Sequence, residues 1–210
     1  MPLLLTGQHS AASFAIWRMT ETRDELEAII GHDAAAAAVA GITSPKRVME
    51  RLAARALFRT AYPAHYCPVA YDGDGRPFLP GRGMRVSFSH TRGHVAMALA
   101  PCAVGVDIEQ HGGKALRIAS RFLNDGELAR VNASPSPEVA AVAMWSAKET
   151  AYKIIGQSVY DFRRTLDVSP AVAAGEESLI VTCVAPGCPS NLALHCQVFD
   201  WGVLTVGAAE

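Results

Sequence analysis

Two acidic residues interrupt a short apolar stretch, VGVDIE, at residues 104–109. Its β-branched residues predict a buried strand. Asp107 and Glu109 are two positions apart, so both carboxylates point to the same face of that strand. Neighbouring carboxylates repel each other and lose hydration on burial. The pattern therefore indicates either a strand that runs out into solvent or a neutralising partner, most simply a hard divalent cation.

A second stretch, MWSAKETAYKIIG at residues 144–156, favours the cation. It places Glu149 on a helix, with Lys148 beside it and Lys153 one turn further on. Three carboxylates from two elements, with lysines alongside, are typical of a site for Mg²⁺ and a phosphate ester. The alternative is an ordinary ion pair between Glu149 and Lys153, worth about 0.2–0.5 kcal/mol.

Composition limits the class of protein. The 210 residues have room for one large domain or two small ones, and 50% hydrophobic residues with 19% charged ones predict a globular chain. A net charge of −1 excludes a general affinity for polyanions, so we expect no nucleic-acid partner. No apolar run is long enough to span a bilayer, so we expect a soluble cytoplasmic protein without membrane contact. The five cysteines form no C-x-x-C pair, which predicts reduced thiols.

A helix rich in arginine is predicted in the first half of the chain. Ser44-Pro45 marks its start, and it runs to about Tyr62 before Pro63 stops it. Its arginines recur every four residues and form one stripe: Arg47, Arg51, Arg55 and Arg59. Like charges at this spacing repel each other. The stripe is either a binding face for an anion or a solvated face partly paired to Glu50.

A turn-rich segment and a hairpin follow. Residues 71–80 carry Arg76 and cannot be helical. Residues 84–90 and 94–100 alternate as two strands around a short turn. Ser89 and His90 therefore lie at a strand end, where hydroxyl and imidazole groups can meet a ligand. A single histidine in such a place is usually structural, so His90 gains meaning only with suitable neighbours.

The remaining elements repeat one order in each half of the chain. We expect strands at 13–19, 165–169, 178–184, 192–200 and 203–208, and helices at 21–30, 34–40, 115–122 and 137–155, with a short helix after Asn124. The apolar positions predicted to face the core on the last helix are Val139, Val142, Trp145 and Tyr152. A helix followed by antiparallel strands in each half predicts an α+β fold of two similar lobes, residues 1–103 and 104–210.

Four motifs occur together in one order. They are GRPFLP at residues 75–80, SFSHT at 87–91, GVDIE at 105–109 and WSAKETAYK at 145–153. In this order and at these separations they resemble the 4′-phosphopantetheinyl transferases of the surfactin-synthetase-activating type, group II. The resemblance covers roughly residues 47–156. One departure is Gln157-Ser158, where many members have a second glycine.

The resemblance implies a fold, an activity and partners. The family fold is a pseudo-dimer of two similar α/β lobes with the active site at their interface. Its members transfer the phosphopantetheine arm of coenzyme A to a serine of an acyl or peptidyl carrier protein and release adenosine 3′,5′-bisphosphate. They use Mg²⁺ and serve fatty acid, polyketide or nonribosomal peptide biosynthesis. We therefore expect coenzyme A as co-substrate, Mg²⁺ as cofactor, a carrier protein as partner and a monomeric chain.

The motif positions imply roles for individual residues. The metal-binding carboxylates correspond to Asp107, Glu109 and Glu149, and Glu149 also corresponds to the proposed base. The groups that touch the phosphates or the nucleotide correspond to Arg76, Ser89, His90 and Lys153. In the family, an arginine of the helix that corresponds to residues 45–62 also meets the nucleotide. Arg55 fits this position best, with Arg47 and Arg51 as alternatives. The residues expected to act in the transfer itself are Glu149, Lys153 and His90.

The implied chemistry agrees with the residues. Attack of a serine hydroxyl on the β-phosphate is phosphoryl transfer, in which the protein mainly positions reactants and neutralises charge. Lys153 and His90 add positive charge or hydrogen bonds, and Glu149 or a bound water takes the serine proton.

Two other functions fit the carboxylates. One is another Mg²⁺-dependent phosphoanhydride enzyme, such as a nucleotide hydrolase, but the sequence has no Gly-rich P-loop and no carboxylate-rich hydrolase motif. The other is a non-catalytic module that binds coenzyme A or a carrier, which the intact acidic residues and Lys153 argue against.

An acidic carrier needs a local docking surface on a chain that is nearly neutral. Residues 117–128 directly follow the metal strand and offer Arg117 and Arg121. Apolar side chains lie beside and between these arginines: Leu116, Phe122 and Leu123. We expect the arginines to steer the carrier and the apolar contact to supply affinity. For Phe122 the alternative is a place in the core, since an aromatic at that spacing is more often core than surface.

Overall fold

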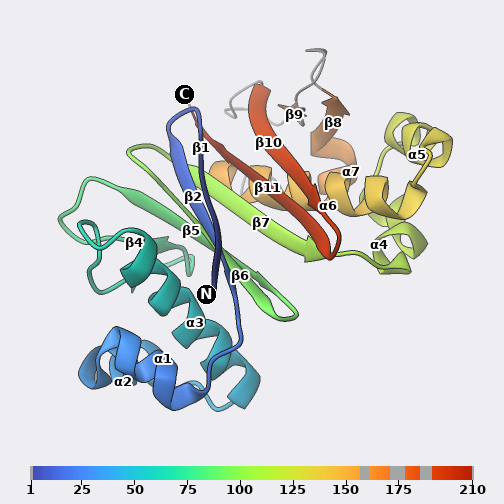
Figure 1. Ribbon diagram of the computed structural model, residues 1–210. Helices are drawn as coiled ribbons and strands as arrows, with labels where there is room; N and C mark the ends of the chain where they lie inside the picture. Colours follow the sequence, from blue (N-terminus) through green and yellow to red (C-terminus); the bar gives the residue numbers. More distant parts are fainter. Residues whose placement is uncertain (1, 157–160, 171–177, 185–190, 210) are drawn as a thin grey trace.

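The computed structural model describes residues 2–156, 161–170, 178–184 and 191–209 (Figure 1). Two antiparallel sheets form its centre, with strand orders β1-β2-β6-β5-β4-β3 and β7-β11-β10-β9-β8. The first sheet contains β1 (Leu3–His9), β2 (Ala12–Arg18), β3 (Ala70–Tyr71), β4 (Pro77–Phe78), β5 (Arg85–Thr91) and β6 (His94–Ala100). The second contains β7 (Val104–Gln110), β8 (Leu166–Pro170), β9 (Ser178–Cys183), β10 (Asn191–Phe199) and β11 (Gly202–Ala208).

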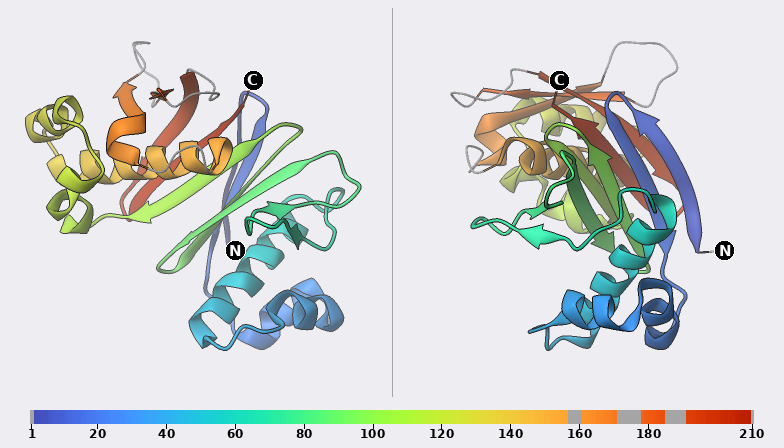
Figure 2. Two further views of the ribbon diagram at one scale, coloured as in Figure 1. Left: turned by 180° about the vertical axis from the view of Figure 1, so that it is seen from behind. Right: turned by 90° about the vertical axis from the view of Figure 1, so that its left-hand side faces the viewer.

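Helices cover the outer face of each sheet (Figures 1 and 2). Helix α3 (Pro45–Ala61) lies on the first sheet, in contact with β2 and β6, and α1 (Arg23–Ile30) and α2 (His32–Val39) pack on α3. On the second lie α4 (Gly113–Arg117), η1 (Ala119–Arg121), α5 (Asp125–Ala133), α6 (Pro137–Ile155) and α7 (Phe162–Thr165). Of these, α6 crosses β7 and β11.

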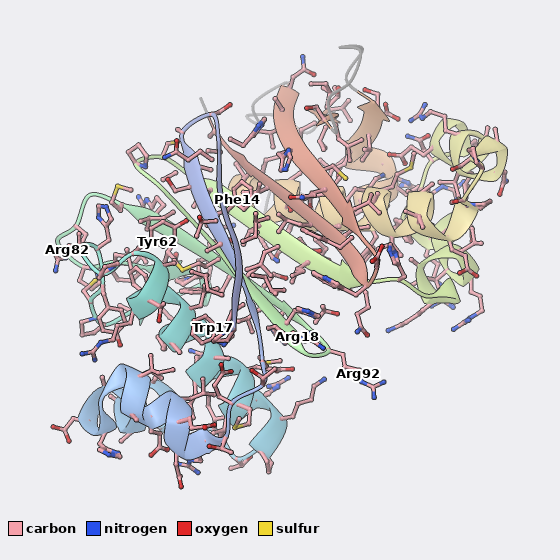
Figure 3. All side chains as sticks on the ribbon, in the orientation of Figure 1. Phe14, Trp17, Arg18, Tyr62, Arg82 and Arg92 are labelled. Atoms are coloured by element: carbon pink, nitrogen blue, oxygen red, sulfur yellow. The ribbon has the colours of Figure 1, made fainter. Side chains whose placement is uncertain are left out.

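The inner faces of the two sheets pack on each other. Strand β6 shows the pattern: Ala96 and Ala98 face the second sheet, whereas Val95 and Met97 face the helices of the first. Figure 3 shows the same division on β2, where Trp17 lies beside α3 and Phe14 lies further along the strand. Small alanines allow close sheet packing, and both faces of β6 become core.

Serine hydroxyls join the two sheets where β5 runs beside β7. The Ser87 hydroxyl accepts a hydrogen bond from the Val106 N–H at 3.1 Å, and the Ser89 hydroxyl accepts one from the Ile108 N–H at 3.3 Å. These side chains satisfy buried backbone donors at an edge of β7. They therefore fix the acidic strand against the first sheet.

Helix α6 approaches β7 closely at Gly105. A β-carbon at this position would clash with the carbonyl oxygen of Thr150 on α6. Glycine is therefore required by the close approach, which brings the acidic face of β7 against the helix.

Most elements predicted from the sequence are present. The helix 137–155 and the strand 94–100 have the predicted bounds, Ser44 caps α3 and Thr22 caps α1. Strand β1 and helix α7 were not predicted. The predicted helix 115–122 is wrong, because the chain forms the short α4 and the separate turn η1.

The mixed α/β fold class is confirmed by these two antiparallel sheets and their helices. The pseudo-dimer and the division into lobes 1–103 and 104–210 stay predictions. Gln157-Ser158 and Cys188 lie outside the described residues. Among the described cysteines, Cys67, Cys102 and Cys183 are free thiols. In the described part of the chain, none of the helices combines the length and the apolar character needed to cross a membrane.

Candidate active site

One face of α6 meets the acidic face of β7. Trp145, Glu149 and Lys153 are spaced by four residues and share this side of the helix. The Lys153 ammonium donates to Asp107 Oδ1 and to the Val106 carbonyl oxygen, each at 2.8 Å. Lys153 therefore pairs across to β7, and the ion pair with Glu149 that was the alternative reading of this spacing is not formed.

Asp107 lies deepest in this arrangement, with 4% of its surface exposed. Its Oδ1 accepts from Lys153 and from the Ser89 hydroxyl, the latter at 2.9 Å. Its Oδ2 is buried and has no hydrogen-bond partner among the described residues. A buried acceptor without a donor is costly, so this oxygen is suited to a cation.

The other two carboxylates are destabilised in their charged forms. Burial, followed by the charge of Asp107, raises the pKa of Glu109, while a hydrogen bond from Trp145 acts in the opposite direction. Burial, again followed by the charge of Asp107, raises the pKa of Glu149. Glu149 accepts no hydrogen bond from any residue that the structure describes. One lysine thus faces three carboxylates, and added positive charge would stabilise the cluster.

The donor atoms fit a hard cation. Mg²⁺ is usually held by one or two carboxylates together with phosphate oxygens, and seldom by a complete protein cage. Within the described ranges, no group of three or more His, Cys, Asp or Glu side chains is placed so that it could hold a metal ion by itself. Asp107 and Glu109 present their oxygens on one face of β7, and Glu149 lies opposite them.

A hollow of about 560 Å³ lies beside this site, between α3 and β5. It brings together four residues expected to bind the nucleotide: Arg47, Arg55, Ser89 and His90. Ser89 connects the hollow to the carboxylates, since its hydroxyl group contacts Asp107. The arginines that line the hollow give it the positive charge that favours a phosphate-bearing ligand.

The arginine stripe is not a simple solvated face. Arg55 is 5% exposed, lies over the Phe88 ring and donates to the Tyr71 hydroxyl at 2.9 Å. Burial lowers the pKa of the Arg55 guanidinium, which still remains charged at neutral pH. The Arg51 guanidinium also donates a hydrogen bond to the Tyr71 hydroxyl.

Glu50 does not pair with this stripe. Its Oε2 lies 3.1 Å from His90 Nε2 and its Oε1 lies 3.6 Å from the Lys46 ammonium. The predicted pairing of Glu50 to the arginines is therefore wrong. His90 therefore has a suitable neighbour, because the buried carboxylate of Glu50 orients its imidazole.

Arg76 lies apart from the first hollow. It lines a second hollow of about 680 Å³ together with Lys153 and Tyr152. The Arg76 guanidinium lies against Gly156, at the end of α6, where a β-carbon would overlap it. The two hollows share Pro77 and Phe88, so they adjoin. The residues expected to bind the phosphates and the nucleotide are therefore divided between two neighbouring hollows.

Lys148 does not belong to the site. Its side chain is fully buried on another side of α6, and its ammonium donates to Glu127 Oε2 at 2.7 Å. The prediction of two lysines alongside Glu149 is therefore wrong for Lys148. Adjacent helical residues are separated by about 100°, so Lys148 points away from the face that Glu149 shares with Trp145 and Lys153.

Two predictions on aromatic residues need correction. Tyr152 was expected in the core but is 38% exposed at the second hollow. Trp145 was expected to serve only the core, yet its indole N–H donates to Glu109 Oε1 at 3.0 Å. The spacing of four residues between Trp145 and Glu149 was the available signal for this second role.

The predicted docking segment is only partly a surface. Arg117 and Arg121 are exposed, whereas Phe122 and Leu123 are 3% and 0% exposed. These two residues belong to the core under α6, so the predicted apolar docking contact is wrong for them. A further exposed arginine, Arg92, projects from the β5–β6 turn (Figure 3). Its carbonyl accepts from Gln110 at the end of β7.

The comparisons concern the second half of the chain. Residues 103–183 match the sequence profile of the 4′-phosphopantetheinyl transferase superfamily (ACPS). The matched segment is less than half of the chain and includes the carboxylates of β7 and the whole of α6. No curated protein sequence matches the chain significantly. The profile match supports phosphopantetheinyl transfer as the general kind of activity and leaves the residues of the first hollow outside it.

Proposed function

We propose that the chain transfers the 4′-phosphopantetheine arm of coenzyme A to a serine of an acyl or peptidyl carrier protein, as a Mg²⁺-dependent enzyme of the group II type. The observation that carries this proposal is the pairing of the β7 carboxylates with the Glu149 and Lys153 face of α6. The profile match over the same elements supports it. The second product is adenosine 3′,5′-bisphosphate.

The two hollows would hold the donor substrate. Arg47, Arg55 and His90 offer charge-assisted hydrogen bonds to the nucleotide and its phosphates in the first hollow. Arg76 and Lys153 line the adjoining second hollow. Coenzyme A is long enough to reach both, with its pyrophosphate near Ser89, which lines the first hollow and contacts Asp107.

The transfer forms one bond and breaks one. The carrier serine oxygen attacks the β-phosphorus, and the bond from that phosphorus to the bridging oxygen breaks. Glu149, or a water at its carboxylate, accepts the hydroxyl proton. Burial raises the pKa of Glu149 when no cation is bound, and a water at its carboxylate is the alternative proton acceptor when Glu149 holds the cation.

Charge at the pyrophosphate is balanced from two sides. Lys153 is held by Asp107 and the Val106 carbonyl, so its ammonium is preorganised for the developing charge. Asp107, Glu109 and Glu149 would hold Mg²⁺, which supplies Lewis-acid neutralisation when bound.

Mass spectrometry of an apo carrier tests the proposal. The chain, coenzyme A, Mg²⁺ and the carrier are incubated together, and the carrier should gain one phosphopantetheinyl group. Asp107→Ala should abolish this gain, while Asp24→Ala, which removes an exposed carboxylate on α1, should not. Consumption of coenzyme A without any carrier would indicate a hydrolase, and an unchanged carrier with unchanged coenzyme A would indicate a binding module.

Docking of an acidic carrier is proposed at the exposed arginines of α4 and η1. Arg117→Glu with Arg121→Glu should lower kcat/KM for the carrier and reduce its salt dependence, because exposed charges steer association. Arg82→Glu is the matched control, since Arg82 is exposed on a distant loop (Figure 3). Equal kinetics for both variants would place the docking surface elsewhere.

A further inference from the structure

Trp145 contributes a single hydrogen-bond donor to the acidic site. Its indole N–H, the only polar group of the side chain, points at Glu109 Oε1 over 3.0 Å. The two residues come from different elements, α6 and β7, so the bond joins the helix to the strand. One of the two oxygens of Glu109 is thereby fixed.

Two phenylalanine rings hold the indole. Phe122 meets it edge-on, with ring centroids 4.9 Å apart and ring planes at 72°. Phe162 packs at 5.8 Å with the planes at 49°. Such contacts restrict both side-chain torsions of a tryptophan. The N–H therefore has one direction, toward β7.

The backbone of both phenylalanines is anchored by Lys148. The Lys148 ammonium donates to the Phe122 carbonyl at 2.9 Å and to the Phe162 carbonyl at 3.1 Å. Lys148 is itself fully buried and paired with Glu127. The two phenylalanines that hold Trp145 are thus anchored by a buried residue of α6 and not by exposed side chains.

We propose that Trp145 is a positioning residue for Glu109, fixing Oε1 so that Oε2 is presented to the divalent cation. This inference rests on the metal site of the proposed function. Metal-binding carboxylates are commonly oriented by such outer hydrogen bonds, and loss of one weakens metal binding by about 10–100-fold.

Trp17 provides a matched comparison within the same chain. Its indole N–H also donates to a carboxylate, Glu21 Oε2, at 3.1 Å. That pair lies at the end of β2, remote from β7 and α6. Trp17→Phe therefore removes the same kind of bond without touching the acidic site.

Binding of Mn²⁺ alone, followed by the electron paramagnetic resonance of the free ion, tests the inference without any carrier. Trp145→Phe should weaken Mn²⁺ binding roughly 10-fold, while Trp17→Phe should leave it unchanged. In transfer assays Trp145→Phe should raise the Mg²⁺ concentration for half-maximal rate by a similar factor, with kcat largely recovered at saturating Mg²⁺. A purely structural role would lower stability without this shift.

A second measurement keeps the test independent of the folding of Trp145→Phe. In Trp17→Phe/Trp201→Phe, Trp145 is the single tryptophan of the chain, and Mn²⁺ should quench its emission. Absence of quenching, or equal Mn²⁺ affinity of wild type and Trp145→Phe, overturns the inference. Failure of carrier modification together with Trp145-dependent Mn²⁺ binding would instead overturn the proposed function alone.

Discussion

Two lysines of helix α6, five residues apart, have opposite surroundings. Lys148 is 0% exposed and donates to four oxygens, three from the backbone and one from Glu127. The other oxygen of Glu127 accepts from the Val168 N–H at 2.8 Å. Lys153 is 25% exposed and faces three carboxylates, one of which keeps a buried oxygen without a partner among the described residues.

The difference separates structure from function. Around Lys148 every charge and donor is compensated within the chain, so the group holds the fold together and has nothing left for a ligand. Around Lys153 negative charge is in excess, and burial raises the pKa of Glu109 and Glu149. An incompletely compensated cluster beside two hollows is the usual mark of a binding or catalytic site.

The largest expected effect is the loss of stability when the buried partner of Glu127 is removed. Lys148→Ala leaves Glu127 charged and buried without its partner, which should lower the free energy of unfolding by about 3–5 kcal/mol. Lys153→Ala, on the partly exposed side, should cost only about 1–2 kcal/mol while abolishing transfer. Urea denaturation measures both. Equal losses for the two variants would contradict the comparison.

A second change acts where α6 meets β7. Gly105→Ala puts a methyl group against the Thr150 carbonyl, so the helix must shift and the free energy of unfolding should fall by about 1–3 kcal/mol. Transfer should fall as well, because Lys153 and Asp107 move apart. Gly73→Ala has open space at the same atom and serves as control. Normal activity in Gly105→Ala would show that the close approach is not needed.

The smallest expected effect is the change in stability when the negative charge of Glu149 is removed. Because the pKa of Glu149 is raised in the folded chain, the folded state binds its proton more tightly than the unfolded state. The resulting stability is present below the ordinary glutamate pKa and is lost as the pH rises through the folded-state value. Glu149→Gln should therefore stabilise the chain at pH 7 and raise its unfolding temperature.

This gain should disappear at about pH 4, where the glutamate of the wild type is protonated. Glu138→Gln, which changes an exposed carboxylate at the start of the same helix, provides the control. Thermal unfolding from pH 4 to 8 measures the difference. A Glu149→Gln variant less stable than wild type at pH 7 would mean that the carboxylate is compensated after all.

The sequence was sufficient to predict the elements that carry the site. Ser-Pro and the terminal Gly156 predicted α6 with its observed bounds, and the spacing of Asp107 and Glu109 predicted their shared face. Helical periodicity also predicted that Glu149 and Lys153 lie one turn apart on one side. These features depend on local rules, which a single sequence contains.

Features that depend on tertiary contact could not be predicted. The buried role of Lys148 depends on carbonyl oxygens of three residues far from it in sequence, and no local pattern encodes that cage. Phe122 was expected in the docking contact, with the core as its alternative because an aromatic at that spacing is more often core, and the ring packs on Trp145. Ser89 gave no sign that its hydroxyl group would reach across to Asp107.

Transfer requires that the Lys153 face of α6 and the acidic face of β7 hold a cation together with the phosphates of coenzyme A. Calorimetric titration of coenzyme A into the wild-type chain, with and without Mg²⁺, and into Asp107→Asn measures this directly. We predict that Mg²⁺ tightens coenzyme A binding to the wild type and has no such effect on Asp107→Asn. An equal effect of Mg²⁺ on both chains, or none on the wild type, would contradict the account.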